Sequence, residues 1–132
     1  MKQQYPVRIR DVMTDHFQLV DGMMNVAEAI MLMRQHNSRL LIIDKRHDDD
    51  EYGIVLLSDI ARGVLAENRS PQRVNVYEVM SKPVVGVDPD MDIRYCARLF
   101  HSMGFSYAPV IDTGKVLGIV GYADLVLDGL IK

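Results

Sequence analysis

The sequence predicts an α/β fold (an α+β, sandwich-like arrangement) of two similar β-α-β-β-α units. Three observations lead to this prediction: the 132-residue chain repeats itself once, each copy holds one stretch with helical periodicity, and its aliphatic runs are short. Three strands and two helices are marginally stable alone. We therefore expect the two units to pack sheet to sheet with pseudo-two-fold symmetry.

The repeat is visible in two pairs of motifs. IRDVMT at 9–14 corresponds to VYEVMS at 76–81, and GIVLLSDI at 53–60 corresponds to GIVGYADL at 118–125. Two copies are too few for a solenoid, which favours two units that pack on each other.

Each copy contains an amphipathic stretch with helical spacing. In the first copy the apolar positions are Val26, Ala29, Ile30 and Met33, and Asn25 precedes them as a predicted N-cap. In the second copy, Asp92 is the predicted cap of a stripe formed by Ile93, Cys96, Ala97 and Phe100. Asn37 and Gly104 suit the left-handed residue that ends such helices.

Short aliphatic runs after these helices predict strands that are buried on both faces. The expected strands are 40–43, 53–57, 108–111 and 116–120, and extended pieces at 16–20 and 83–87 precede the helices. Asp59 and Asp124 are then expected to open final helices at 59–67 and 124–131. The predicted domains are a first repeat at 7–67, a polar linker at 68–73 and a second repeat at 74–132.

Composition excludes several classes of protein. Apolar residues make up 48% of the chain and charged residues 25%, with a net charge of −3. These values are typical of a globular protein and give no basic surface for nucleic acid. No apolar run is long enough to span a membrane. The single cysteine excludes an internal disulfide and favours a cytoplasmic location.

The order of these motifs resembles a tandem pair of CBS domains, also called a Bateman module. IRDVMT and VYEVMS resemble the first segment of a CBS repeat, and SYAPVID at 106–112 resembles its second strand. GIVLLSDI and GIVGYADL, called the GIV frames below, resemble its last strand and the start of its last helix. The resemblance covers residues 7–131. It implies a stand-alone regulatory module and not an enzyme. It also implies a homodimer that binds AMP, ADP, ATP or S-adenosylmethionine between its repeats and signals by a conformational change to a regulated protein.

The resemblance also implies two ligand sites, in each of which an aspartate accepts hydrogen bonds from ribose hydroxyls. The first would combine Asp59, Ser81, Pro83, Val85, Tyr107, Ala108 and Pro109. The second would combine Asp124, Gly121, Tyr122, Thr14, His16, Gln18, Arg39, Leu40 and Leu41. No catalytic residue, metal or required cofactor is expected.

Three positions depart from the family pattern. Leu56 and Gly121 stand where the family has a hydroxyl side chain, and Leu41 replaces a strand proline. Leucine would crowd a phosphate, whereas Gly121 is expected to leave room and a free backbone N–H. The missing hydroxyls favour a ligand with little phosphate, such as S-adenosylmethionine.

Other interpretations stay open from the sequence. Asp59 and Asp124 would also serve as helix caps without any ligand. The pair would then be a ligand-free dimerisation or interaction module. A small enzyme that acts on a nucleotide is a further alternative, although no phosphate-binding loop motif is present.

Overall fold

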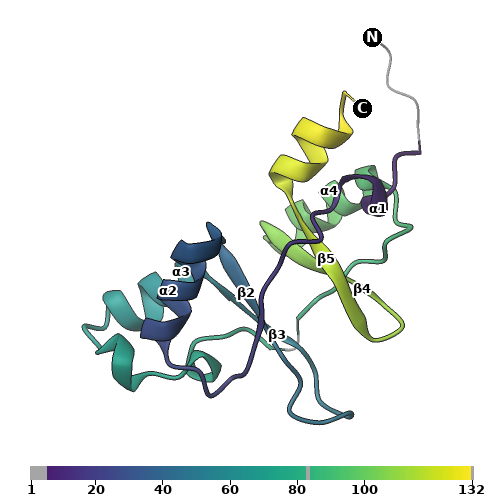
Figure 1. The fold of residues 1–132 in the computed structure, drawn as a ribbon. Coiled ribbons are helices and arrows are strands. Elements are labelled where there is room, and N and C mark those ends of the chain that lie inside the picture. The colour runs from purple at the N-terminus through teal and green to yellow at the C-terminus, as the bar shows by residue number, and fades with distance from the viewer. Residues whose placement is uncertain (1–5, 83, 132) are drawn as a thin grey trace. The chain divides into compact units, whose positions relative to one another are not determined.

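The computed structural model describes residues 6–82 and 84–131, and these form two compact units. The central unit runs from Phe17 to Val84. The terminal unit combines the residues before Phe17 with those from Val85 onward. Figure 1 shows both units along the chain.

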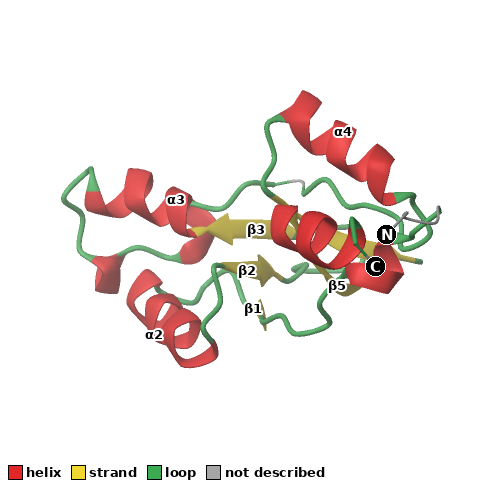
Figure 2. Cartoon of the chain, turned by 90° about the horizontal axis from the view of Figure 1, so that it is seen from above, coloured by secondary structure: helices red, strands yellow, loops and turns green. Residues whose placement is uncertain are grey.

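The central unit is built on a three-stranded sheet in the order β1-β2-β3. Strand β1 (Leu19–Val20) is parallel to β2 (Leu40–Ile43), and β2 is antiparallel to β3 (Gly53–Leu56). Figure 2 shows helices α2 (Val26–His36) and α3 (Leu57–Ile60) near the edge of the sheet where β2 begins and β3 ends. The remaining helical turns are η1 (Ala61–Leu65), η2 (Pro71–Arg73) and η3 (Val76–Glu78).

The terminal unit contains an antiparallel pair of strands, β4 (Tyr107–Asp112) and β5 (Lys115–Gly121). Its helices are α1 (Ile9–Val12), α4 (Ile93–Met103) and the π-helical η4 (Asp124–Gly129). Val87 forms a parallel bridge with Val110, in the place that β1 takes in the central unit.

The helix caps confirm the predictions from local sequence. The side chain of Asn25 accepts a hydrogen bond from the Glu28 N–H at 2.8 Å, and Asp92 accepts one from the Arg94 N–H at the same distance. Asn37 and Gly104 both end their helices in the left-handed conformation. The two long helices therefore begin and end where side-chain chemistry requires.

The opening motif of each repeat pairs with the GIV strand of the other repeat. Thr14 exchanges backbone hydrogen bonds with Ile119 at 3.0 and 2.9 Å, and Ser81 exchanges them with Ile54 at 2.9 and 3.0 Å. A Cβ at Gly118 would lie 2.3 Å from the Thr14 carbonyl oxygen, so the second GIV frame needs glycine at its first position. Each compact unit therefore differs from the sequence repeat, because the opening segments are exchanged.

The segment predicted as a linker is part of the central unit. The guanidinium of Arg69 contacts the carboxylate of Glu78 at 2.9 Å, and the buried Val74 accepts the Val26 N–H at 2.8 Å. Each unit has its own apolar core, which lies around Val26, Leu41 and Val55 in the central unit and around Phe100 and Val120 in the terminal unit.

Candidate ligand-binding site

Asp59 and Asp124, the aspartates of the two GIV frames, have the same backbone role. Each sits in the first turn of a helix and accepts the N–H of the residue three positions earlier. Asp59 accepts from Leu56 at 2.8 Å, and Asp124 accepts from Gly121 at 2.7 Å. Helix α3 starts at Leu57, two residues before Asp59, which corrects the predicted start of the first of these helices; η4 starts at Asp124, as predicted. In both cases the carboxylate binds a backbone N–H that precedes the helix.

Asp59 has a second, charged partner in its own helix. The Arg62 guanidinium donates to the other carboxylate oxygen of Asp59 at 2.9 Å. The Asp59 side chain is only 8% exposed, whereas that of Arg62 is 76% exposed. Both oxygens of Asp59 are therefore occupied. A basic residue three positions after an acidic one is a helical ion-pair spacing that the sequence already displays.

Asp124 has no such cation among the residues that the structure describes. Its half-buried carboxylate accepts the Gly121 N–H, and among residues 6–82 and 84–131 its second oxygen has no donor. Burial raises the pKa of Asp124, the Gly121 hydrogen bond opposes that rise, and the nearby negative Asp128 adds to it. The second carboxylate oxygen of Asp124 is thus a hydrogen-bond acceptor without a protein donor among the described residues, and it is partly shielded from water.

The expectation that Gly121 leaves room and a free N–H is wrong. Its N–H is bound to Asp124, and a Cβ there would lie 2.7 Å from the ring of Tyr107. Tyr107 faces Gly121 across the β4–β5 ladder, so the ring fills the space that glycine leaves. Leu56 occupies the corresponding position in the central unit and is partly buried.

The two predicted sites each draw on both compact units. For the first, Asp59 and Ser81 belong to the central unit and Val85, Tyr107, Ala108 and Pro109 to the terminal unit, while Pro83 lies outside the described residues. For the second, Thr14, His16, Gly121, Tyr122 and Asp124 belong to the terminal unit and Gln18, Arg39, Leu40 and Leu41 to the central unit. The structure therefore describes each half-site separately.

In the terminal unit, hydrogen bonds and a ring contact hold the residues predicted for the second site. The Thr14 hydroxyl accepts the His16 N–H at 3.2 Å, and the Thr14 backbone is held on Ile119. Tyr122 packs edge-on against Phe100 with ring centroids 5.3 Å apart. These contacts hold Thr14 and the residues that precede Asp124 in place within the terminal unit.

In the central half, the predicted residues surround the start of β2. Leu40 and Leu41 are buried in the strand, and the Gln18 side chain is hydrogen-bonded to Ser38. The exposed Arg39 lines a pocket of about 210 Å³ together with Ile30 and Leu57. Within the described part of the chain, no group of three or more acidic, histidine or cysteine side chains is arranged to hold a metal ion.

A family model described as "CBS domain" matches residues 9–66 and 76–128. The chain belongs to the CBS-domain family. The mixed α/β fold is that of a CBS pair, as the resemblance of the motifs predicted. None of the described helices combines the length and the apolar character that crossing a membrane requires.

Similar proteins extend this assignment. Protein MK0525 of Methanopyrus kandleri is 30% identical over 70% of the chain, and the match spans 47% of that relative's length. The hexameric CBS-CP12 protein from bloom-forming cyanobacteria is 36% identical with a TM-score of 0.90, over 93% of this chain and 71% of that one. The CBS domain pair of protein MJ0100, solved with 5′-methylthioadenosine and S-adenosyl-L-methionine, is 25% identical with a TM-score of 0.82. That match covers 97% of this chain and all of the other.

Proposed function

We propose that this CBS pair is a sensor of an adenosine-type ligand and that Asp124 is the acceptor for the ribose hydroxyls. The observation that carries the proposal is the second oxygen of Asp124, which receives no hydrogen bond from the described residues. A half-buried acceptor without a donor is stabilised by a ligand that supplies one. The adenosyl ligands of the MJ0100 pair support this class of molecule.

Charge favours a ligand with little phosphate. Asp128 lies close enough to Asp124 to raise its pKa, and neither Leu56 nor Gly121 offers a hydroxyl. A triphosphate near two carboxylates would meet like charge, whereas a cationic sulfonium would not. We therefore rank S-adenosylmethionine above AMP and ADP, and ATP last.

The module regulates through its conformational equilibrium and has no catalytic step in this proposal. A ligand shifts that equilibrium only by its difference in affinity between two arrangements. The protein is proposed to act as a homodimer in the cytoplasm. Cys96 suits that reducing compartment, because it is a free, buried cysteine whose thiol pKa is raised to about 11 by burial.

The test is binding of S-adenosylmethionine, 5′-methylthioadenosine, AMP, ADP and ATP, measured by calorimetry and thermal unfolding. A ligand at about 100 times its Kd stabilises the folded state by about 2.7 kcal/mol. Asp124→Asn should weaken binding by about tenfold or more, since a hydrogen bond to a charged group is lost. Asp128→Asn is the matched control and should leave binding intact or improve it. The adenosine proposal is wrong if none of these compounds shifts unfolding.

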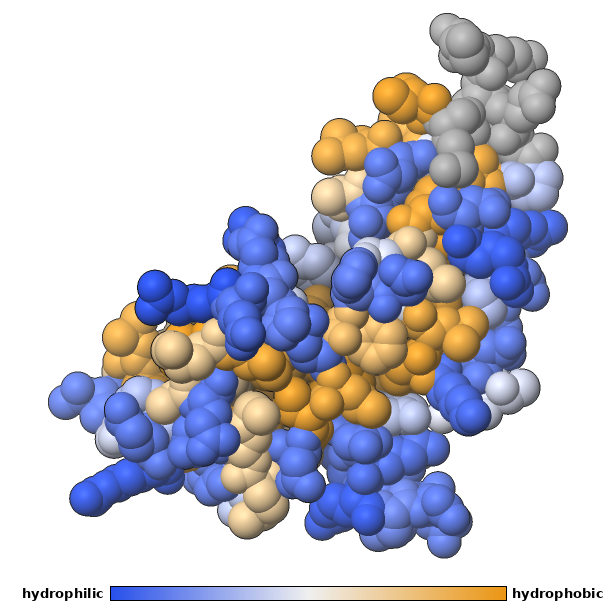
Figure 3. Space-filling view, viewed as in Figure 1, coloured by the Kyte–Doolittle hydropathy of each residue, from blue (hydrophilic) through white to orange (hydrophobic). Residues whose placement is uncertain are grey.

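A second candidate, a ligand-free interaction module, is favoured by exposed apolar side chains on η4 and on the two residues that follow it. Leu127 is 67% exposed and Ile131 82% exposed, and Val126 and Leu130 beside them are also exposed. Figure 3 shows apolar atoms over the C-terminal helix beside hydrophilic ones. Burial of such surface in a dimer would be favourable. Leu127→Glu should then raise the monomer fraction in sedimentation experiments without any ligand present.

A further inference from the structure

The central unit contains a pocket of about 340 Å³ whose lining includes none of the described residues predicted for the adenosine sites; Pro83 lies outside the described residues. It is bounded by the ends of β1 and β2, at Asp21 and Asp44, and by the segment from Tyr77 to Lys82. In the β2–β3 register, Ile43 pairs with Gly53 at this edge of the sheet, whereas Leu40 pairs with Leu56 at the other edge. The pocket and the Asp59 carboxylate are therefore at opposite edges.

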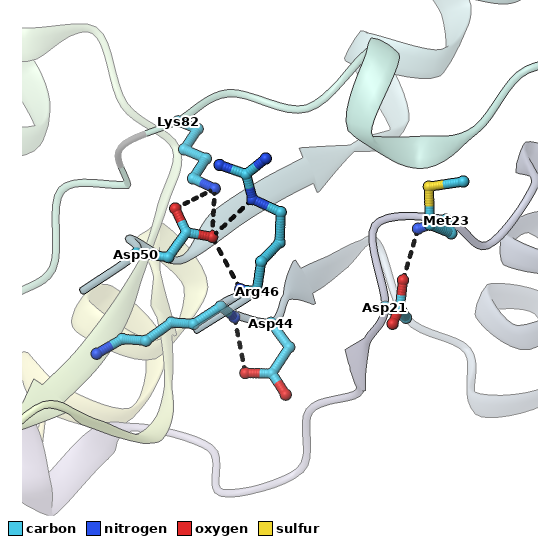
Figure 4. A network of polar contacts seen from close by, with 7 residues as sticks. Asp21, Met23, Asp44, Arg46, Asp50 and Lys82 are labelled. Atoms are coloured by element: carbon cyan, nitrogen blue, oxygen red, sulfur yellow. Dashed lines mark hydrogen bonds and ion pairs between the residues drawn. The ribbon is translucent and has the colours of Figure 1, made fainter. Parts of the chain in front are cut away.

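Two carboxylates of the pocket each retain one oxygen for a ligand. Asp21 accepts the Met23 N–H at 2.7 Å and Asp44 accepts the Lys45 N–H at 2.8 Å, each through Oδ1. In the part of the chain that the structure describes, no donor reaches either Oδ2. Both residues also border a smaller adjoining pocket of about 110 Å³. Figure 4 shows Asp21 with Met23 on one side and Asp44 with Arg46 on the other.

The cationic side of the pocket is only partly neutralised. Lys82 contacts both carboxylate oxygens of Asp50, at 2.7 and 2.8 Å, so its charge is matched. Arg46 contacts the same Asp50 through its backbone N–H at 2.8 Å and through Nε at 3.2 Å. The hydrogen bonds from Lys82 and Arg46 hold the pKa of Asp50 well below its usual range. The two terminal nitrogens of Arg46 have no acceptor among the described side chains and carbonyls.

The pocket also has an apolar lining, to which Ile43, Met80 and Tyr77 contribute. A ligand that fits must therefore present an apolar body, a cationic group for Asp21 and Asp44, and an anionic group for Arg46. The volume lies at the lower end of the range for small-molecule sites, about 300–1,000 Å³. This size suits an amino acid better than a nucleotide.

We propose that this pocket binds a small α-amino acid with an apolar side chain. Its ammonium would lie between Asp21 and Asp44, its carboxylate would accept a forked pair of hydrogen bonds from Arg46, and its side chain would cover Met80 and Tyr77. The site is independent of the adenosine site, and it gives the sensor a second input. A simple anion lacks partners for the two aspartates, and a simple amine leaves Arg46 without an acceptor.

The experiment uses L-leucine as the probe with the full chain, in calorimetry and thermal unfolding. Two analogues each lack one charge: isoamylamine has no carboxylate, and 4-methylpentanoate has no ammonium. Leucine should bind, and each analogue should bind at least about tenfold more weakly, as expected for the loss of one charged hydrogen-bonding group. The proposal is overturned if leucine causes no shift, or if either analogue binds as well as leucine.

Variants locate the site. Asp44→Asn and Arg46→Gln should each weaken leucine binding by about tenfold. Asp48→Asn is the control, because Asp48 is exposed in the same loop and does not line the pocket. Urea denaturation of each variant checks folding. Asp124→Asn should leave leucine binding unchanged, and Asp44→Asn should leave adenosine binding unchanged, so failure of one proposal is distinct from failure of the other. Leucine binding that survives both Asp44→Asn and Arg46→Gln would place the ligand elsewhere and overturn the assignment.

Discussion

Asp59 and Asp124 come from the same motif and hold the same backbone bond, yet their surroundings differ. Arg62 occupies the second oxygen of Asp59, whereas the position 65 residues later is Leu127, and Asp124 has Asp128 nearby instead. The backbone bond is common to both repeats, so it belongs to the fold. The second oxygen differs between them, and it is the part of the motif to which we assign the ligand.

The largest effect is expected where a repeat contacts the exchanged opening segment. Gly118→Ala would place a Cβ 2.3 Å from the Thr14 carbonyl oxygen, whereas Gly53→Ala would meet the flexible Met80 sulfur at 2.7 Å. The Thr14 backbone can move away from an added Cβ less easily than the end of the Met80 side chain can. Gly118→Ala should therefore cost about 1–3 kcal/mol of unfolding free energy and Gly53→Ala less. Urea denaturation measures both, and equal losses would contradict the comparison.

The helix caps should respond differently to acid. Arg94 lowers the pKa of Asp92 to about 2, against about 3.9 in an unfolded chain. A lowered pKa adds stability above pH 4 that is lost as the pH falls from about 4 to about 2. Asp92→Asn keeps a capping side chain but removes this titration. The difference in unfolding free energy between the native protein and the variant should therefore shrink as the pH falls from about 4 to about 2.

Alanine variants of the caps complete this prediction. Asp92→Ala should cost about 1 kcal/mol at pH 7, as for other N-caps. Asn25→Ala should cost a similar amount. Its cost should depend less on pH than that of Asp92→Ala, because Asn25 does not titrate and contacts a titratable group only through the neutral Nδ2–H that it donates to Glu28 at 3.0 Å. An equal loss for both variants between pH 4 and pH 2 would show that the Asp92 carboxylate is not the source of the pH dependence.

Exchange of Arg62 and Leu127 tests the difference between the two aspartates directly. Leu127→Arg should supply Asp124 with a partner and weaken adenosine-ligand binding by up to about fivefold. Leu127→Gln is the matched control without charge. Unchanged affinity in the arginine variant would mean that the second oxygen of Asp124 is not the ligand acceptor.

The smallest effect is expected for the reverse change. Arg62→Leu removes an exposed partner and should cost only about 0.2–1 kcal/mol of stability. Its informative readout is binding, since it leaves Asp59 with an unoccupied oxygen. A new weak site in calorimetry would show that the ion pair, and not Leu56, keeps the first site closed.

The parts of the fold set by neighbouring residues were predictable from the sequence. The caps of the two long helices act within a few positions of the chain, so the sequence alone indicates where these helices begin and end. The capping residues are Asn25, Asn37, Asp92 and Gly104. The exchange of opening segments was not predictable, because pairing between Thr14 and Ile119 leaves no periodic signal. Its one local trace is Gly118, a glycine at a place where another backbone approaches closely.

For the site, residue type was more predictable than surroundings. The two aspartates were identified from the repeat. The ion pair between Arg62 and Asp59 was not predicted, although its three-residue spacing is the signal that could have revealed it. The position of Tyr107 against Gly121 depends on strand register, which the motif does not contain. The space that Gly121 was expected to leave for a ligand is therefore filled by the ring of Tyr107.

The division of the chain into units has a consequence for the order of synthesis and for mechanical load. All residues of the central unit have been synthesised once Val84 is made, whereas the first segment of the terminal unit must wait for residues 89–93 and for Ile119, its hydrogen-bonding partners. The central unit can thus fold first, while residues 6–16 remain unpaired. Tension applied between the two ends of the described chain would load the terminal unit before it reaches the central one, so in a pulling experiment the terminal unit should open first.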